Sequence, residues 1–261
     1  MPADRSVRPW PAVATLARRE ITRFMRQPAR IAAAVGTALL LWIVVGGGFA
    51  HSVSPAGSSS YSSYLIPGLM TLVAMFAAIF SNISIIEDRR EGFLQGVLVS
   101  PAPRAAIAGG LIGGGALVAW IQAMALLPLA AFSEPGLSVA ALVPVAIALL
   151  LTSVALQSLG LIFAWRCRDS ASFHAVMNLV LMPLWLLSDA LFPAGGASPW
   201  IGSLIAVNPL SWCASAVRQA LATPGDGEFA LGIGWPMLGT AAFAVVAFLG
   251  AVATTRTRSA A

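Results

Sequence analysis

Apolar residues are gathered into six long runs, each separated from the next by a polar or turn-forming segment. The runs cover about residues 31–53, 65–86, 105–132, 139–164, 172–192 and 229–253. A helix needs about 20 apolar residues to cross roughly 30 Å of hydrocarbon. The pattern therefore predicts an all-α integral membrane protein with six transmembrane helices over residues 31–256. These spans leave no room for a soluble catalytic domain in the 261 residues.

The segment before the first span has a different pattern. Through residues 10–30, apolar side chains recur near helical spacing and arginines fill the positions between them. A basic amphipathic helix with Trp10 at its start is typical of the membrane headgroup layer, and Pro28 should end it before the first span. We assign residues 1–30 to a cytoplasmic N-terminus with this interfacial helix. Two roles remain open: a topology anchor, or an elbow that also contacts a cytoplasmic subunit. The candidate site residues of this interfacial helix are Arg18, Arg19, Arg23 and Phe24.

The stretch 193–228 contains four prolines, and its apolar piece 200–207 is too short to cross a membrane. A further helix is expected after Asn208-Pro209. A seventh span here would bury Arg218, at a cost of about 2.5–3.5 kcal/mol near the bilayer centre. We therefore expect two short re-entrant helices between spans five and six, shielded by protein.

The charge pattern sets the expected orientation. All fifteen basic residues are arginine, and fourteen of them fall on one side of the six-span pattern, with only Arg218 on the other. The positive-inside rule then places both termini, including the tail 257–261, in the cytoplasm. The net charge of +5 is explained by this topology, so no nucleic-acid partner is expected. Anionic membrane lipid is the partner that attracts such arginines.

The residue inventory excludes several kinds of chemistry. A phosphate-binding P-loop needs a lysine, and this chain has none, so energy must come from a partner or an ion gradient. Cys167 and Cys213 are expected on opposite membrane faces, and neither the cysteines nor His51 and His174 have metal-ligand spacing. No cofactor, metal or catalytic residue is expected in this chain.

The third span is rich in glycine. Gly109/Gly113 and Gly110/Gly114 both have the small-xxx-small spacing that lets helix backbones approach closely. We expect tight packing against a neighbouring helix there, the alternative being a flexible hinge.

Between the second and third spans lies a charged segment, 87–100, that is unusual for a connector. It opens with five consecutive charged residues, Glu87 to Glu91, and continues after Gly92 with an apolar face at helical spacing. That face consists of Phe93, Leu94, Val97 and Leu98. A solvated loop with these residues on the membrane surface is the alternative to a docking element.

These segments carry a family resemblance. Tyr64-Leu65-Ile66-Pro67-Gly68, the run Glu87 to Gly92, and Ser100-Pro101-Ala102-Pro103-Arg104 resemble type-2 ATP-binding-cassette exporter permeases. Asn208-Pro209-Leu210-Ser211-Trp212, followed by Val217-Arg218, is similar to the late extracytoplasmic motif of that family.

The resemblance implies that the 87–100 segment seats in a groove of a separate cytoplasmic ATPase subunit, which binds ATP and Mg. It also implies export and a second permease copy, identical or similar, in the plasma membrane; arginine-only usage and richness in alanine and glycine point to a bacterium. The implied coupling residues are Glu87, Arg90, Glu91, Gly92, Phe93, Leu94, Val97 and Leu98.

Polar groups inside the spans are few, which suits a hydrophobic, amphipathic or lipid-linked substrate. Asn82, Gln122, Asn178 and Asp189 are the candidates for a pathway or for interhelical hydrogen bonds. For Asp189, pairing with Arg218, a pathway role and simple exposure all remain open. A gradient-driven transporter and, less favoured, a membrane-embedded enzyme are the alternative functions. The sequence names neither the substrate nor the dimer type.

Overall fold

The computed structural model describes residues 9–49, 60–99, 103–133, 137–191, 198–222 and 234–257, and these ranges contain helices and connections without a β-strand. The all-helical prediction is confirmed for this part of the chain. The helices are α1 (Pro9–Met25), α2 (Pro28–Leu41), η1 (Trp42–Gly46), α3 (Tyr61–Arg90), α4 (Phe93–Val99), α5 (Arg104–Met124), α6 (Leu127–Ser133), η2 (Val139–Ala141), α7 (Leu142–Arg166), α8 (Ser170–Leu186), α9 (Pro199–Val207), α10 (Pro209–Leu221) and α11 (Trp235–Thr257).

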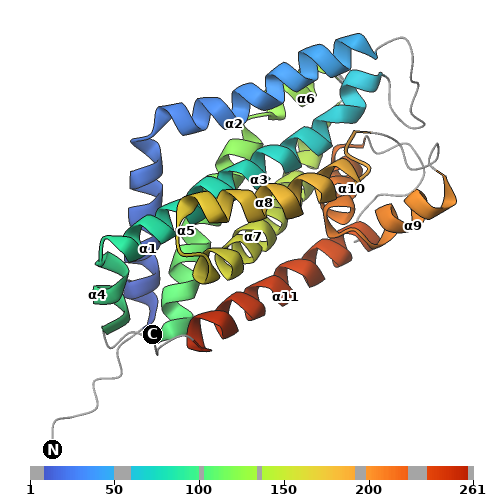
Figure 1. Cartoon of the computed structure of the whole chain (residues 1–261). Helices are drawn as coiled ribbons and strands as arrows, with labels where there is room; N and C mark the ends of the chain where they lie inside the picture. Colours follow the sequence, from blue (N-terminus) through green and yellow to red (C-terminus); the bar gives the residue numbers. More distant parts are fainter. Residues whose placement is uncertain are drawn as a thin grey trace, which may run out of the picture.

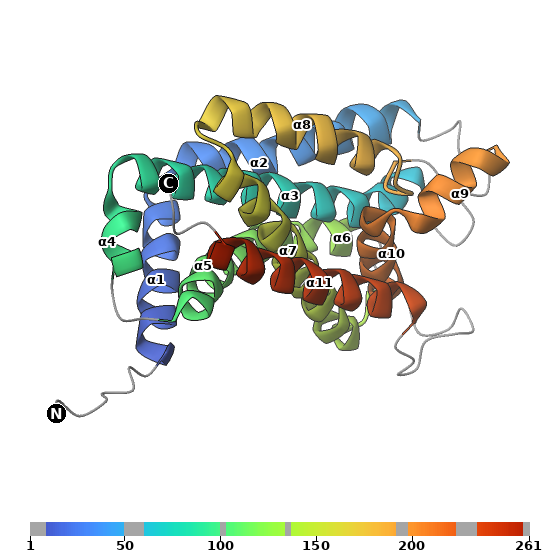
Figure 2. The same cartoon turned by 60° about the horizontal axis from the view of Figure 1, so that its bottom comes forward.

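Helix α3 lies at the centre of the bundle, where it contacts α2, α5, α7, α8 and α10 (Figure 1). It is buried on all sides because its apolar residues are not confined to one stripe. Helix α7 packs against α11, α5 and α10. Helix α1 lies across one end of this bundle, and α9 and α10 lie at the other end (Figure 2).

Four stretches in the described part of the chain are long and apolar enough to cross a membrane: Tyr61–Arg90, Arg104–Ser133, Val139–Arg166 and Trp235–Thr255. Two apolar helices are shorter, Ile31–Gly46 and Ser170–Leu186. Each predicted run is thus mainly helical, with a turn between α5 and α6 inside the third run and a non-helical end after Leu186 in the fifth; residues 50–53, 192 and 229–233 of those runs lie outside the described ranges. The number of six spans stays a prediction.

Helices α9 and α10 would count as one further span only if taken together, and their axes are bent by 80°. The bend is at Asn208, whose side-chain Oδ1 accepts a hydrogen bond from the Leu210 amide at 2.9 Å. Pro209 follows at the first position of α10, where its missing N–H costs nothing. The two short helices expected in this stretch are present, and their depth in the membrane stays a prediction.

One expected boundary needs correction. Residues 87–90 form the last turn of α3, so the opening of the charged segment is helical and only Glu91 and Gly92 separate α3 from α4. Within the first predicted span, Trp42–Gly46 is a π-helical turn in a continuing helix. Pro28 acts as expected on α1, which ends at Met25.

Candidate functional site

Helix α1 is attached to the bundle through glycine positions of α5. A Cβ on Gly110 would lie 2.9 Å from the Leu16 Cβ, and one on Gly114 would lie 2.9 Å from the Ala17 Cα. Nothing lies within 4 Å of the same atom on Gly109 or Gly113. The expected close packing therefore holds for one glycine pair, and its partner is the amphipathic helix.

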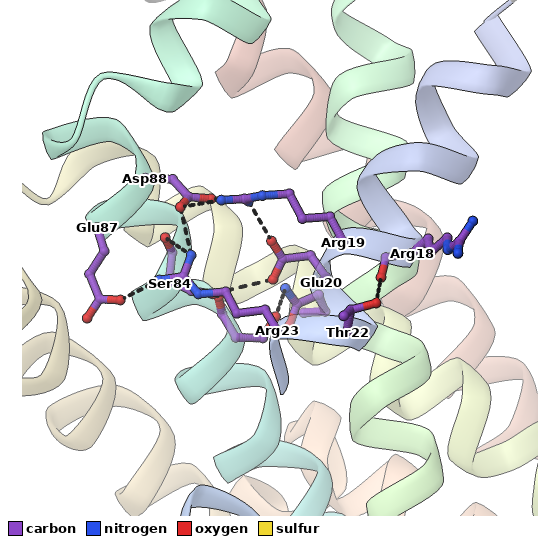
Figure 3. Close-up of polar contacts among 10 residues, drawn as sticks. Arg18, Arg19, Glu20, Thr22, Arg23, Ser84, Glu87 and Asp88 are labelled. Carbon is purple, nitrogen blue, oxygen red and sulfur yellow. Dashed lines mark hydrogen bonds and ion pairs between the residues drawn. The ribbon is translucent and has the colours of Figure 1, made fainter. Parts of the chain in front are cut away.

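This docking brings α1 onto the C-terminal end of α3 and the start of α4. We call the meeting of these three helices the junction (Figure 3). Its residues are Arg19, Glu20, Arg23, Ser84, Glu87, Asp88 and Phe93.

Asp88 is the centre of the junction, since its side chain is only 2% exposed. Arg19 donates two hydrogen bonds to it, from Nη1 to Oδ2 at 2.5 Å and from Nη2 to Oδ1 at 2.8 Å. Arg23 Nη1 donates to Asp88 Oδ1 at 2.7 Å, and its Nη2 donates to Glu87 Oε2 at 2.9 Å. Such a two-pronged arginine–carboxylate pair fixes orientation as well as distance. The hydrogen bond to Asp88 raises the pKa of Arg19.

Glu20 lies behind this pair and is buried, with 4% of its surface exposed. Burial raises the pKa of the Glu20 carboxyl, and the charge of Asp88 raises it further, while Arg19, Arg23 and the Ser84 hydroxyl lower it. The ion pair with Arg19, at 3.4 Å, is too long to offset the desolvation. In front of Glu20, the guanidinium groups of Arg19 and Arg23 face the carboxylates of Asp88 and Glu87.

Helix α4 is joined to the same cluster. The Arg19 guanidinium lies over the Phe93 ring, 3.9 Å from its centroid. Leu94 is 1% exposed and packs in a cluster with Ile85, Ile107 and Leu111. A motion of α4 must therefore displace α1 and α3 as well.

The expected apolar face of α4 is divided in the structure. Leu94 points into the protein, Val97 is partly buried against the same cluster, and Phe93 is 40% exposed. The Leu98 side chain lies outside the described set. Arg90 and Glu91 are exposed, and Gly92 has a φ of +82°, a backbone conformation that favours glycine. The surface available to a partner is thus the Arg90–Phe93 turn, and Leu94 anchors it from behind.

Arg89 ties the end of α3 to the end of α7. Its Nη1 donates to the Trp165 carbonyl at 2.9 Å, and its Nη2 donates to the Cys167 carbonyl. Arg104 Nη1 donates to the Thr255 carbonyl of α11 at 3.1 Å. The arginines of α1, α3, α5 and α7 therefore lie at the same end of the bundle. The sequence predicts this distribution.

The opposite end carries one ion pair among the described residues. Arg218 Nη1 donates to Asp189 Oδ2 at 2.5 Å, and Ser215 donates to the same oxygen at 2.8 Å. The guanidinium also lies over the Tyr64 ring, at 4.2 Å. Tyr64 and Asp88 are both on α3, 24 residues or about 36 Å apart. The expected pairing of Asp189 with Arg218 is present.

The other polar candidates are dispersed. Asn82 Nδ2 donates to the Gln157 carbonyl at 3.4 Å, and Gln157 Nε2 donates to Ser81 Oγ at 3.3 Å, so these amides link α3 to α7. Gln122 is buried on α5, whereas Asn178 is exposed on α8. In the described part of the chain no cluster of three acidic, histidine or cysteine side chains could hold a metal.

Sequence reasoning missed Asp88, Glu20 and Arg89 as site residues. One signal was available: Glu20 is the only acidic residue in α1, and it stands in a segment of arginines. No comparable sequence signal distinguishes Asp88 from its charged neighbours.

The described part of the chain is that of a multi-pass helical membrane protein, with four helices able to cross a membrane and a charged junction at its arginine-rich end. The sequence profile of ABC-2 type transporters matches residues 11–222, which run from α1 through α10. The chain belongs to the ABC-2 type transporter family, as the resemblance predicted.

Two relatives support this membership. The chain is 24% identical over 212 residues to the "putative transport permease ycf38" of Porphyra purpurea, covering 79% of this chain and 72% of the relative. It is 22% identical over 192 residues to the "probable multidrug ABC transporter permease YbhR" of Escherichia coli K12, covering 71% of this chain and 52% of the relative. The chain is thus a membrane permease subunit of an ABC transporter, a family that normally works with an ATP-binding-cassette subunit.

Proposed function

We propose that this chain forms the translocation pathway of an exporter for hydrophobic, amphipathic or lipid-linked compounds. Separate cytoplasmic ATPase subunits, which hold ATP and Mg, supply the energy. The observation that carries the proposal is the junction, where α4 is tied to both α1 and α3 at the arginine-rich end of the bundle.

The orientation follows from the charges. The arginines of α1, α3, α5 and α7 face the cytoplasm, and the Asp189–Arg218 pair lies at the external end of a bacterial inner membrane. In this orientation both termini are cytoplasmic. The exposed turn Arg90–Phe93 then points toward the compartment that contains ATP.

The pathway lies between two copies of the chain. Helix α3, at the centre of one copy, is buried by its neighbours, and its polar residues Asn82 and Ser81 bond within the same chain. A filled interior supports a pathway between copies, lined by apolar faces. Such a lining favours lipid-like compounds because few polar groups are available to replace the hydration of a sugar.

Transport is tested by reconstituting the chain with its ATPase subunit in vesicles. A lipid-like drug is expected to move only when ATP is present, whereas a soluble sugar is not transported. Transport that follows an ion gradient without ATP, or transport of the sugar alone, would contradict the proposal.

Coupling is tested at Gly92, whose left-handed backbone holds the turn before α4. Gly92→Leu is expected to distort this turn, at a cost of about 1–2 kcal/mol because L side chains are strained there, and to abolish most ATPase stimulation. Space is not the cause, since nothing lies within 4 Å of a Cβ at Gly92. Glu91→Arg is expected to reduce co-purification with the ATPase through reversed charge.

Gly92→Asn is the matched control, because asparagine tolerates the left-handed region better than leucine. It should retain most of the stimulated turnover. Wild-type co-purification and turnover in both Gly92→Leu and Glu91→Arg, with normal membrane insertion, would remove the coupling role from this turn.

A further inference from the structure

We propose that the exposed side of α1 is a binding site for anionic phospholipid, with Arg18 and Arg26 as its phosphate ligands. This inference concerns a ligand of the permease alone, and it does not depend on the ATPase or on the transported substrate.

Three arginines on α1 and Arg26, which directly follows its last residue, form two pairs. Arg19 and Arg23 face α3 and are held by Asp88 and Glu87. Arg18 points away from the junction (Figure 3). Arg18 and Arg26 are exposed, and neither guanidinium has an ion pair or hydrogen bond to the part of the chain that the structure describes. Their charges remain available to an external anion.

The free pair lies beside an open groove of about 620 Å³ on the α1 surface. Its lining residues are Thr15, Arg18, Arg19, Thr22, Arg23, Arg26 and Gln27. No acidic residue is among them, and within the described part of the chain the charges of Arg18 and Arg26 are not balanced by a carboxylate. Arg26 is eight positions after Arg18, a rise of about 12 Å if the helical rise is continued one residue past Met25, so each guanidinium would take a separate phosphate.

The positions around α1 indicate a membrane surface as the source of those phosphates. At 100° per residue, the exposed arc passes from Trp10 and Met25 to Arg18, and then to Arg26. Trp10 is 77% exposed and Met25 is 66% exposed. The side of α1 opposite this exposed arc, which carries Leu16 and Phe24, is buried.

When a helix lies on a membrane, an apolar strip enters the boundary between headgroups and acyl chains, and an adjacent cationic strip lies beside the lipid phosphates. A cytosolic acidic protein would meet the cationic strip but would leave Trp10 and Met25 without a partner. Phospholipid with a net negative headgroup satisfies both strips, and tryptophan is favoured at this depth.

The test uses the full-length purified permease in detergent, without the ATPase. Binding of phosphatidylglycerol and of phosphatidylcholine is counted by native mass spectrometry. Wild type is expected to prefer phosphatidylglycerol. Removing both charges in Arg18→Gln/Arg26→Gln should weaken phosphatidylglycerol binding roughly 30-fold, at about one kcal/mol for each arginine near an anionic surface.

Arg166→Gln/Arg168→Gln is the matched control, since it removes two exposed arginines from the end of α7. It should bind phosphatidylglycerol like wild type. Inorganic phosphate, added in excess, should not displace the lipid.

Three outcomes would overturn the proposal. The first is unchanged phosphatidylglycerol binding in the Arg18/Arg26 variant, and the second is equal binding of phosphatidylcholine. The third is displacement by inorganic phosphate, which would show a site for the free anion.

Discussion

Replacing Asp88 with alanine is expected to destabilise the protein by about 2–4 kcal/mol and to uncouple ATPase turnover. Removing one partner of a buried ion pair costs about 3–5 kcal/mol because the remaining charge is unpaired. The loss expected for Asp88→Ala is smaller because the Arg19 and Arg23 side chains are 32% and 24% exposed. Water can therefore solvate part of their unpaired charge. Thermal unfolding of the purified permease measures the loss of stability, and stimulated ATPase activity measures the coupling.

A double-mutant cycle separates the ion pair from local packing. Asp88→Ala, Arg23→Met and the double variant should be non-additive, since Arg23 donates directly to the Asp88 carboxylate. Glu87 remains as a partner of Arg23, so the coupling energy should be smaller than the whole Asp88 effect. Additive losses would mean that Asp88 acts without this arginine.

Gly114→Ala is expected to displace α1 from α5 and to destabilise their contact by about 1–3 kcal/mol, as overpacking of a filled core does. The new Cβ would lie 2.8 Å from the Glu20 Cβ and 2.9 Å from the Ala17 Cα. The second of these is backbone, so the side chains cannot relieve the clash alone. Trypsin should then cleave α1 at its arginines faster than in wild type, and the junction should weaken with it.

Gly113→Ala is the control one position earlier on the same helix. Nothing lies within 4 Å of a Cβ there, and alanine is the better helix former by up to about 1 kcal/mol. It should be neutral or slightly stabilising. Equal cleavage rates in the two variants would show that α1 is not held by close packing on Gly114.

Both variants test whether α1 connects α4 to the rest of the bundle. Gly114 sets how close α1 comes to α5, and Asp88 decides whether α1 is connected to α3. Both contacts are needed if a movement of α4 is to reach the spans, because α4 has only seven residues, and among its described side chains only Leu94 is buried and Val97 partly buried.

The site was only partly predictable. The charged segment and the amphipathic helix were each found from sequence, since periodicity and charge are local properties. Their contact was not, because Arg19 and Asp88 are separated by 69 residues. The sequence also could not show which glycine pair contacts α1. Gly110/Gly114 and Gly109/Gly113 have the same spacing and differ only in which side of α5 faces α1.

The sequence by itself determined where the helices are and that they belong in a membrane, because each run of about 20 apolar residues has one low-energy form in hydrocarbon. Its charge pattern also places fourteen of the fifteen arginines on one side of the predicted six-span pattern and Arg218 on the other. Only the tertiary structure decided that Asp88 is the buried anion and that Arg18 and Arg26 face outward. The reason is that a charged side chain acquires its role from the partner it meets, and that partner is set by helix packing between distant segments.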